Sequence, residues 1–181
     1  MKLNGGSAMF GMTGPRLPKI LILAASITAA LMLAGCGQDM KVQPTEPTAS
    51  TACSLDGMLL LDFPGPKGQI VYDQGPPDFF CDTVELLAIY LRPEQKKRVV
   101  AVYTQDMGKA DWTRPQGHWI DAKSAYYVIG SKRTGSMGPT IGSFAAEQDA
   151  QAFAAQYGGK VLRFDQITFD MVSLDGGVLK N

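Results

Sequence analysis

The first 35 residues constrain the fold most, because they carry a signal that removes them from it. Lys2, Arg16 and Lys19 are the only charged residues before the first cysteine, and an apolar run over 20–33 follows them. A basic start, a short apolar segment and small residues before a cleavage point predict a secretory signal peptide at 1–35. The apolar run is too short for a comfortable membrane span.

The motif at the end of this signal is Leu33-Ala34-Gly35-Cys36, which resembles the bacterial lipobox. That resemblance implies cleavage before Cys36 and lipidation of its thiol and new amino group. The alternative is an ordinary secretory signal followed by an incidental cysteine. With the lipid, we expect the chain on the periplasmic side of a bacterial membrane; inner and outer membrane both remain open.

Removal of the signal leaves 146 of the 181 residues, enough for a hydrophobic core. Lys and Arg fall from 17 to 14 against 17 Asp and Glu, so the formal charge becomes −3. This acidic balance and the lack of a long basic run give no reason to expect nucleic-acid binding. Prolines, threonines and serines without apolar periodicity predict a flexible tether at 36–52 and a domain at 53–181.

Strand and helix patterns alternate along this domain and predict the α+β class. Asp82 followed by Glu85 is typical of a helix start, and Val84, Leu87 and Leu91 share one face of that helix. A second helix is predicted around Ala150–Tyr157. Strands are expected at 58–63, 69–72, 98–103, 119–120, 125–129, 140–144 and 160–164. Strand-helix-strand thus occurs twice, which indicates a duplicated unit or a coincidence.

Two cysteines remain after Cys36, namely Cys53 and Cys81. In an oxidising compartment, two cysteines are compatible with a disulfide. A metal site is the competing interpretation, and the two states are able to alternate. Cys81 precedes the predicted helix, whose N-terminus favours the thiolate form; burial of Cys81 as a core residue is the alternative.

Soft sulfur donors recur in segments that read as loops, and such donors select copper(I). Cys53 and Met58 flank an Asp-Gly turn, and Met137 lies between glycines that allow its side chain to be aimed at a target. Met107 follows a strand and is balanced between ligand and core filler, whereas Met171 is expected in the core. Asp56 and Asp82 suit turn and cap roles better than metal binding.

Other chemistry finds little support in the chain. His118 is its single histidine, which argues against histidine-rich zinc or copper(II) sites. There is no nucleophile elbow, Walker loop or dinucleotide fingerprint.

The sequence resembles the NosL family, the accessory lipoproteins of nitrous oxide reductase. The segments that carry the resemblance are Cys53–Met58, Phe79–Cys81, Gln105–Met107, Trp119–Ala122 with Ala125–Ser131, and Gly135–Gly138. Their order, together with the lipobox, is specific. The resemblance implies two related β-β-α-β units, similar to the organomercurial lyase domain.

Membership would imply a copper(I) chaperone, not an enzyme. Its expected partners are the nitrous oxide reductase apo-enzyme, whose copper-sulfide centre needs the metal, and the membrane assembly complex. The resemblance indicates Cys53, Met58 and Met137 as ligands, with Cys81 and Met107 as weaker candidates. Two alternatives remain: a lipoprotein stabilised by a disulfide that serves interactions, and a thiol-dependent lyase-like enzyme.

Overall fold

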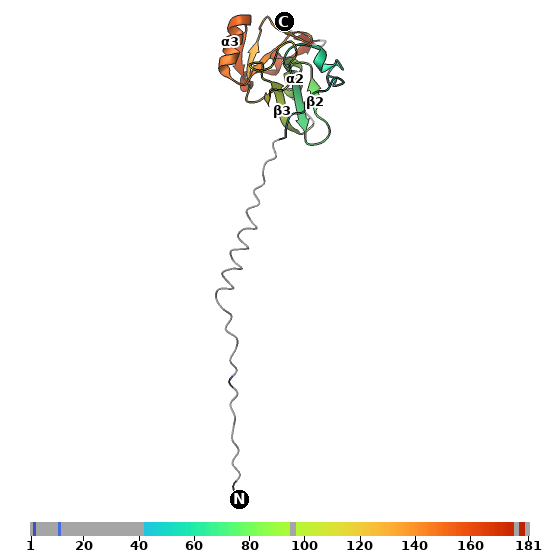
Figure 1. Ribbon diagram of the computed structural model, residues 1–181, viewed down its shortest axis with the longest axis vertical. Coiled ribbons are helices and arrows are strands. Elements are labelled where there is room, and N and C mark those ends of the chain that lie inside the picture. Colours follow the sequence, from blue (N-terminus) through green and yellow to red (C-terminus); the bar gives the residue numbers. More distant parts are fainter. Residues whose placement is uncertain (1, 3–10, 12–41, 95–96, 176–177, 180–181) are drawn as a thin grey trace. The chain divides into compact units, whose positions relative to one another are not determined.

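The computed structural model describes residues 2, 11, 42–94, 97–175 and 178–179. The chain divides into two units, 1–40 and 41–181, and every helix and strand that the structure describes belongs to the second (Figure 1). Apart from Lys2 and Gly11, the predicted signal lies outside the described residues, as does Cys36. Within the described part of the chain, no helix combines the length and the apolar character needed to cross a bilayer.

The first sheet has four antiparallel strands in the order β2-β1-β3-β4. Gly68 of the first strand lies opposite Phe80 on one side and Thr104 on the other. The strands are β1 (Gly68–Tyr72), β2 (Asp78–Phe80), β3 (Val99–Gln105) and β4 (Trp119–Asp121).

The second sheet has three antiparallel strands in the order β8-β5-β9. They are β5 (Tyr126–Ile129), β8 (Gly142–Phe144) and β9 (Lys160–Arg163). Between β5 and β8 lies a short hairpin, β6 (Thr134–Gly135) and β7 (Gly138–Pro139). The remaining elements are the 3-10 helices η1 (Leu60–Asp62), η2 (Phe164–Gln166) and η3 (Phe169–Met171), and the strands β10 (Leu174–Asp175) and β11 (Val178–Leu179).

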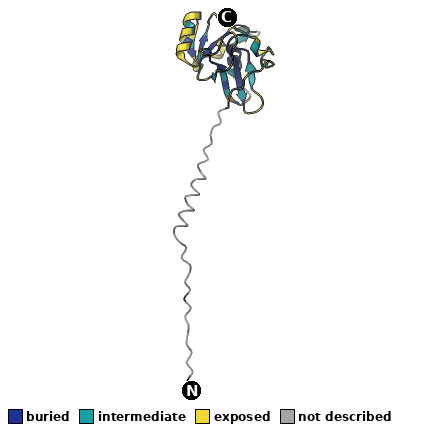
Figure 2. Ribbon diagram, viewed as in Figure 1, coloured by how far each residue is buried: buried dark blue, intermediate teal, exposed yellow. Residues whose placement is uncertain are grey.

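Each sheet receives one helix between its second and third strands in chain order. α2 (Thr83–Tyr90) follows β2, and α3 (Glu147–Tyr157) follows β8. The six residues Thr83–Ala88 of α2 are all buried, whereas Ala150 is the buried residue of α3. Figure 2 shows this contrast, with α3 largely exposed at the margin of the folded unit and α2 inside it.

The burial of α2 follows from its contact with both halves of the core. Val84, Leu87 and Ala88 pack with residues of the second sheet, among them Tyr127. Leu86 packs instead with residues of the first sheet. A Cβ at Gly68 would lie 2.7 Å from that of Leu86, so only glycine lets β1 approach the helix this closely.

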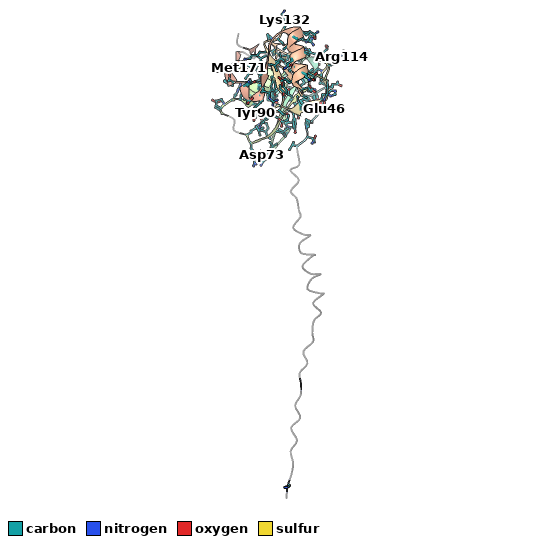
Figure 3. All side chains as sticks on the ribbon, turned by 90° about the vertical axis from the view of Figure 1, so that its left-hand side faces the viewer. Glu46, Asp73, Tyr90, Arg114, Lys132 and Met171 are labelled. Atoms are coloured by element: carbon teal, nitrogen blue, oxygen red, sulfur yellow. The ribbon has the colours of Figure 1, made fainter. Side chains whose placement is uncertain are left out.

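The mixed α+β class is therefore confirmed, and so are both predicted helices and most of the strands. The predicted strand at 58–63 is wrong: Leu59 forms an isolated bridge with Ala52, and η1 follows. Met171 is also not in the core, because η3 leaves it 44% exposed while Val172 is buried. Figure 3 shows Met171 at the margin of the folded unit.

The residues expected to form the tether are described from Val42 onwards. Thr45 exchanges two hydrogen bonds with the buried side chain of Gln69, donating its N–H (2.9 Å) and accepting from Nε2 (3.1 Å). The indole of Trp119 donates to Glu46 Oε1 at 2.7 Å. This part of the chain therefore lies against the first sheet.

Candidate metal centre

The segment Cys53–Met58 forms a closed loop. The Cys53 N–H donates to the Met58 carbonyl (2.8 Å), and the Gly57 N–H donates to the Cys53 carbonyl (2.9 Å). Asp56 Oδ1 accepts from the Met58 N–H at 3.0 Å, as the predicted turn role requires. Gly57 has φ +80°, a conformation that favours glycine. Local hydrogen bonds therefore fix the thiol at the base of the loop.

Two hydrogen bonds attach this loop to β2. The Ser54 N–H donates to the Phe79 carbonyl at 2.7 Å, and the Phe79 N–H donates to Ser54 Oγ at 3.1 Å. Phe79 is two residues before Cys81 in the chain. The attachment therefore brings Cys53 to Cys81, although 27 residues separate them.

The start of α2 supplies a carboxyl group to the same place. Asp82 Oδ1 accepts from the N–H groups of Val84 (3.0 Å) and Glu85 (3.2 Å), so Asp82 is the N-cap that the sequence predicts. Glu85 Oε2 accepts from the Cys81 N–H at 2.9 Å. The carboxyl group of Glu85 therefore lies beside Cys81, which precedes Glu85 by about one helical turn.

Cys53, Cys81 and Glu85 form one buried cluster. The two sulfur atoms and a carboxylate oxygen all lie within 4.8 Å of one another, and both cysteines are free. A hydrogen bond joins Cys53 Sγ and Glu85 Oε2 at 3.2 Å. Among the described residues, Glu85 Oε1 is buried and has no hydrogen-bond partner. This unpaired oxygen and two adjacent thiols fit a cation ligand set.

The protonation of the cluster follows from its burial and its hydrogen bonds. The hydrogen bond from the Cys81 thiol lowers the pKa of Cys53 to about 6. The same hydrogen bond and burial raise the pKa of Cys81 above its usual range. Burial, with Asp82 nearby, raises the pKa of Glu85 to about 9. At neutral pH the cluster therefore holds one thiolate, one thiol and a protonated carboxyl group.

Met58 lies beside this cluster. Its side chain is half-buried and, like Leu55 and Phe79, packs against the hydrophobic cluster of Cys53, Leu60 and Cys81. Its carbonyl accepts a weak hydrogen bond from the Cys81 thiol at 3.7 Å. A thioether is thus part of the packing around the cluster that contains both thiols.

Met137 occupies the turn between β6 and β7 and is half-buried. The preceding residue, Ser136, donates its hydroxyl to Asp82 Oδ2 at 3.0 Å. Gly135 approaches the same carboxylate so closely that a Cβ there would lie 3.0 Å from Oδ2. The turn that carries Met137 is therefore held against the residue that follows Cys81.

Met107 is in another part of the fold. It packs against Val128, Phe144 and Ala150, and its N–H donates to the Ser143 carbonyl at 2.8 Å. It lines a cavity of about 290 Å³ with Trp112 and other residues. The structure does not bring Met107 to the two thiols.

Glu85 is the cluster residue that sequence reasoning missed. The spacing of Asp82 and Glu85 was interpreted as a capping pair, in which the second carboxyl group binds the backbone at the helix start. Glu85 does bind backbone there, at the Cys81 N–H, and this same orientation places it between the thiols. Its position four residues after Cys81, one turn of a helix, was the available signal.

This arrangement has the chemistry of a soft metal site. Two sulfur donors with one oxygen nearby favour a thiophilic ion over Mg²⁺ or Ca²⁺. Cys53 is 4% exposed, yet the outer part of its loop, Asp56 and Gly57, is exposed. One loop thus separates the cluster from solvent.

Comparison with known proteins gives consistent matches. The NosL family model matches residues 44–172. The "Copper-binding lipoprotein NosL" of Stutzerimonas stutzeri is 46% identical over 147 residues, which cover 78% of this chain and 77% of the relative. The protein of the same name from Achromobacter cycloclastes is 37% identical over 164 residues, covering 87% and 83%.

A solved structure agrees with these matches. The crystal structure of the copper chaperone NosL from Shewanella denitrificans superposes with a TM-score of 0.67 at 44% sequence identity. The superposition covers 70% of this chain and 96% of that chain.

Proposed function

Because the chain belongs to the NosL family, we propose that it is a membrane-anchored copper(I) chaperone that delivers copper for assembly of the copper-sulfide centre of nitrous oxide reductase. One observation carries this proposal: Cys53, Cys81 and Glu85 converge in a buried cluster within 4.8 Å. The copper relatives support it. The metal is cargo that the protein takes up and passes on.

Cys53 and Cys81 are the proposed anchoring ligands of copper(I). Thiolates are soft donors, and two of them suit the low coordination numbers that this ion accepts. The thioether of Met58 lies beside them, and that of Met137 is carried by a turn held at Asp82. The carboxyl group of Glu85, protonated in the metal-free cluster at neutral pH, lies beside both thiols and is able to lose its proton to solvent when the ion binds.

Release of copper would begin at the Cys53–Met58 loop. Two hydrogen bonds between Ser54 and Phe79 hold it over the cluster. A partner that breaks this attachment withdraws Cys53 from the ion and leaves the remaining ligands open to exchange. A carrier needs such a labile side, whereas a closed cage of four thiolates has none.

The anchoring proposal follows the sequence and the relatives, which are lipoproteins by name. It comprises a signal at 1–35, a lipid on Cys36, a tether at 36–52 and the copper domain at 53–181, on the periplasmic side. The lipid confines the carrier to the surface where its partners reside, which raises their effective concentration. The proposed partners are the reductase apo-enzyme and the membrane assembly complex.

The two halves of the domain are proposed to descend from one β-β-α-β unit, as in the organomercurial lyase domain. In chain order, β1-β2-α2-β3 gives the sheet order β2-β1-β3, and β5-β8-α3-β9 gives β8-β5-β9. These orders are equivalent position by position. No catalytic role follows, since the proposed function is transport of an ion.

Copper analysis of the full chain tests this function. Protein purified anaerobically from membranes should bind about one copper(I) per monomer, and a thiol assay should find Cys53 and Cys81 reduced before loading. Loaded protein should transfer its copper to the metal-free reductase. Absence of copper(I) binding, or cysteines fully oxidised in protein taken from cells, would contradict the proposal.

A further inference from the structure

Lys67 is a buried cation next to the metal cluster, and it has no role in the proposed copper function. It lies in the turn before β1 and is 0% exposed. Its Nζ donates to the carbonyl oxygens of Phe63 (2.8 Å), Pro64 (3.1 Å) and Cys81 (2.9 Å). Three acceptors match the three N–H donors of an ammonium group, so the geometry is that of the charged form.

This charge has no carboxylate in direct contact. In residues 42–94, 97–175 and 178–179, no ion pair of Lys67 lies within 4.0 Å. Burial lowers the pKa of Lys67 to about 8, and the groups that oppose this effect when they are ionised are Cys81, Asp82, Glu85 and Cys53. A buried charge is costly unless charge of the opposite sign compensates it. The group of the cluster that compensates it at neutral pH is the Cys53 thiolate.

We propose that the fixed charge of Lys67 makes the site selective for a monovalent ion over divalent ions. The inference rests on the proposed copper function and adds a basis for choosing between ions. Lys67 touches no metal ligand atom; it acts through its charge and through the Cys81 carbonyl, and is therefore a positioning residue.

Softness of the ligands does not provide this selection by itself. Zn²⁺ also binds thiolates well and is a frequent occupant of cysteine sites. With the same ligands in the same protonation state, exchange of Cu⁺ for Zn²⁺ adds one positive charge. The Lys67 ammonium repels that additional charge, whereas the sulfur atoms attract both ions.

The size of the effect follows from Coulomb's law. For one added charge at roughly 6–10 Å in a partly buried setting of effective dielectric constant about 20, the affinity ratio changes by about 10- to 100-fold. The bond to the Cys81 carbonyl acts equally on both ions, because it positions a shared ligand. A variant that loses the bond to the Cys81 carbonyl therefore lowers the affinities for Cu⁺ and Zn²⁺ together. A variant that loses the Lys67 charge changes the ratio of these two affinities.

Three variants of the full chain, purified in detergent without oxygen, separate these two effects. Lys67→Met removes the charge, Lys67→Arg keeps it while disturbing the same packing, and Lys109→Met removes an exposed lysine paired with Asp106. Dissociation constants for Cu⁺ and Zn²⁺ are measured for each by competition with chelators of known affinity.

The Cu⁺/Zn²⁺ affinity ratio should fall about 10- to 100-fold in Lys67→Met and stay near the wild-type ratio in Lys67→Arg and Lys109→Met. An unchanged ratio in Lys67→Met would overturn the inference, even if both affinities decline. If Lys67→Met does not fold, Lys67→Gln replaces it, since its amide still donates to carbonyl oxygens. A wild-type chain without Cu⁺ affinity would instead contradict the copper function.

Discussion

The two halves of the domain share a strand order but differ in what their helices do. In the first half, α2 is buried, and its N-terminus brings Asp82 and Glu85 into the interior. In the second half, α3 is mostly exposed and packs through aromatic contacts, such as Phe153 with Phe144 at 5.0 Å between ring centroids. The same strand order thus holds a buried site with polar and sulfur groups in the first half and a helix packed through aromatic side chains in the second half.

This difference indicates which half of such a fold is able to hold a binding site. α2 is held from both sides by core residues, so it positions the Cys81–Glu85 segment rigidly. α3 instead lines the cavity at Met107 and Trp112. Between the halves, the hydrogen bond from Ser136 to Asp82 reaches the residue that follows Cys81. Substitutions in the two halves should therefore have unequal effects on copper.

The largest difference is expected between the two cysteines and Met107, which follows β3 but packs against residues of the second half. Cys53→Ser and Cys81→Ser should each lower copper(I) affinity by more than about 100-fold, the upper limit for losing an outer-shell partner. Met107→Leu should leave the affinity unchanged, because its side chain packs elsewhere. Competition titration with a copper(I) chelator measures all three. Equal losses in Met107→Leu and the cysteine variants would remove the distinction between the halves.

The thiolate of the first half should appear at unusually low pH. Because the pKa of Cys53 is lowered from 9.0 to about 6, thiolate forms as the pH rises through 6. Ultraviolet thiolate absorbance of the metal-free protein should show this step, and Cys53→Ser should lack it. A single step near pH 9 in the wild-type protein would contradict the described hydrogen bonding.

Glu85→Gln should have opposite effects on stability and binding. The folded-state pKa of about 9 exceeds the ordinary 4.5, so the stability associated with this group is complete below pH 4.5 and decreases as the pH rises toward 9. Glu85→Gln cannot ionise and so does not lose stability in this way. In the metal-free state, its melting temperature should therefore exceed that of the wild type by more at pH 8 than at pH 5. Copper(I) affinity should fall about 10-fold.

Thermal unfolding at the two pH values, followed by chelator competition, checks both effects. Glu147→Gln, on the exposed face of α3, is the matched control and should change neither. A melting temperature that rises equally at both pH values would exclude the ionisation of Glu85 as the cause.

The smallest effect should come from the contact between the halves. Ser136→Ala removes the hydrogen bond to Asp82 that holds the Met137 turn. The loss of one such bond corresponds to about 2- to 10-fold in affinity. Copper transfer to a chelator in stopped flow should accelerate by a similar factor. If Met137→Leu leaves the copper(I) affinity unchanged, Ser136→Ala should leave it unchanged as well. A lower affinity in Ser136→Ala alone would show that the turn acts without the Met137 thioether.

Local patterns in the sequence predicted the framework well. The helical face of α2, its cap at Asp82 and most strands of both sheets follow from short-range periodicity, whereas β2 was not predicted. The strand at 58–63 failed because the Cys53–Met58 loop closes on itself and η1 continues from it. Hydrophobicity alone does not distinguish a short strand from such a turn.

The site was less predictable, because it depends on contacts between distant segments. Cys53 and Cys81 were identified by their chemistry, yet their proximity arises from the pairing of Ser54 with Phe79. Met107 also carries a soft sulfur donor, but it lines a different cavity, together with residues of α3. Lys67 carried no signal at all, since nothing local reveals that a lysine in a proline-rich turn is buried.

X-ray absorption at the copper edge of the copper(I)-loaded protein tests the central claim most directly, because it counts the sulfur atoms bound to the ion. If Cys53 and Cys81 both hold copper, the wild-type protein should show at least two sulfur neighbours. Cys81→Ser should lose one of them, and Met107→Leu should lose none. An unchanged sulfur count in Cys81→Ser would contradict a site built on the convergence of the two cysteines.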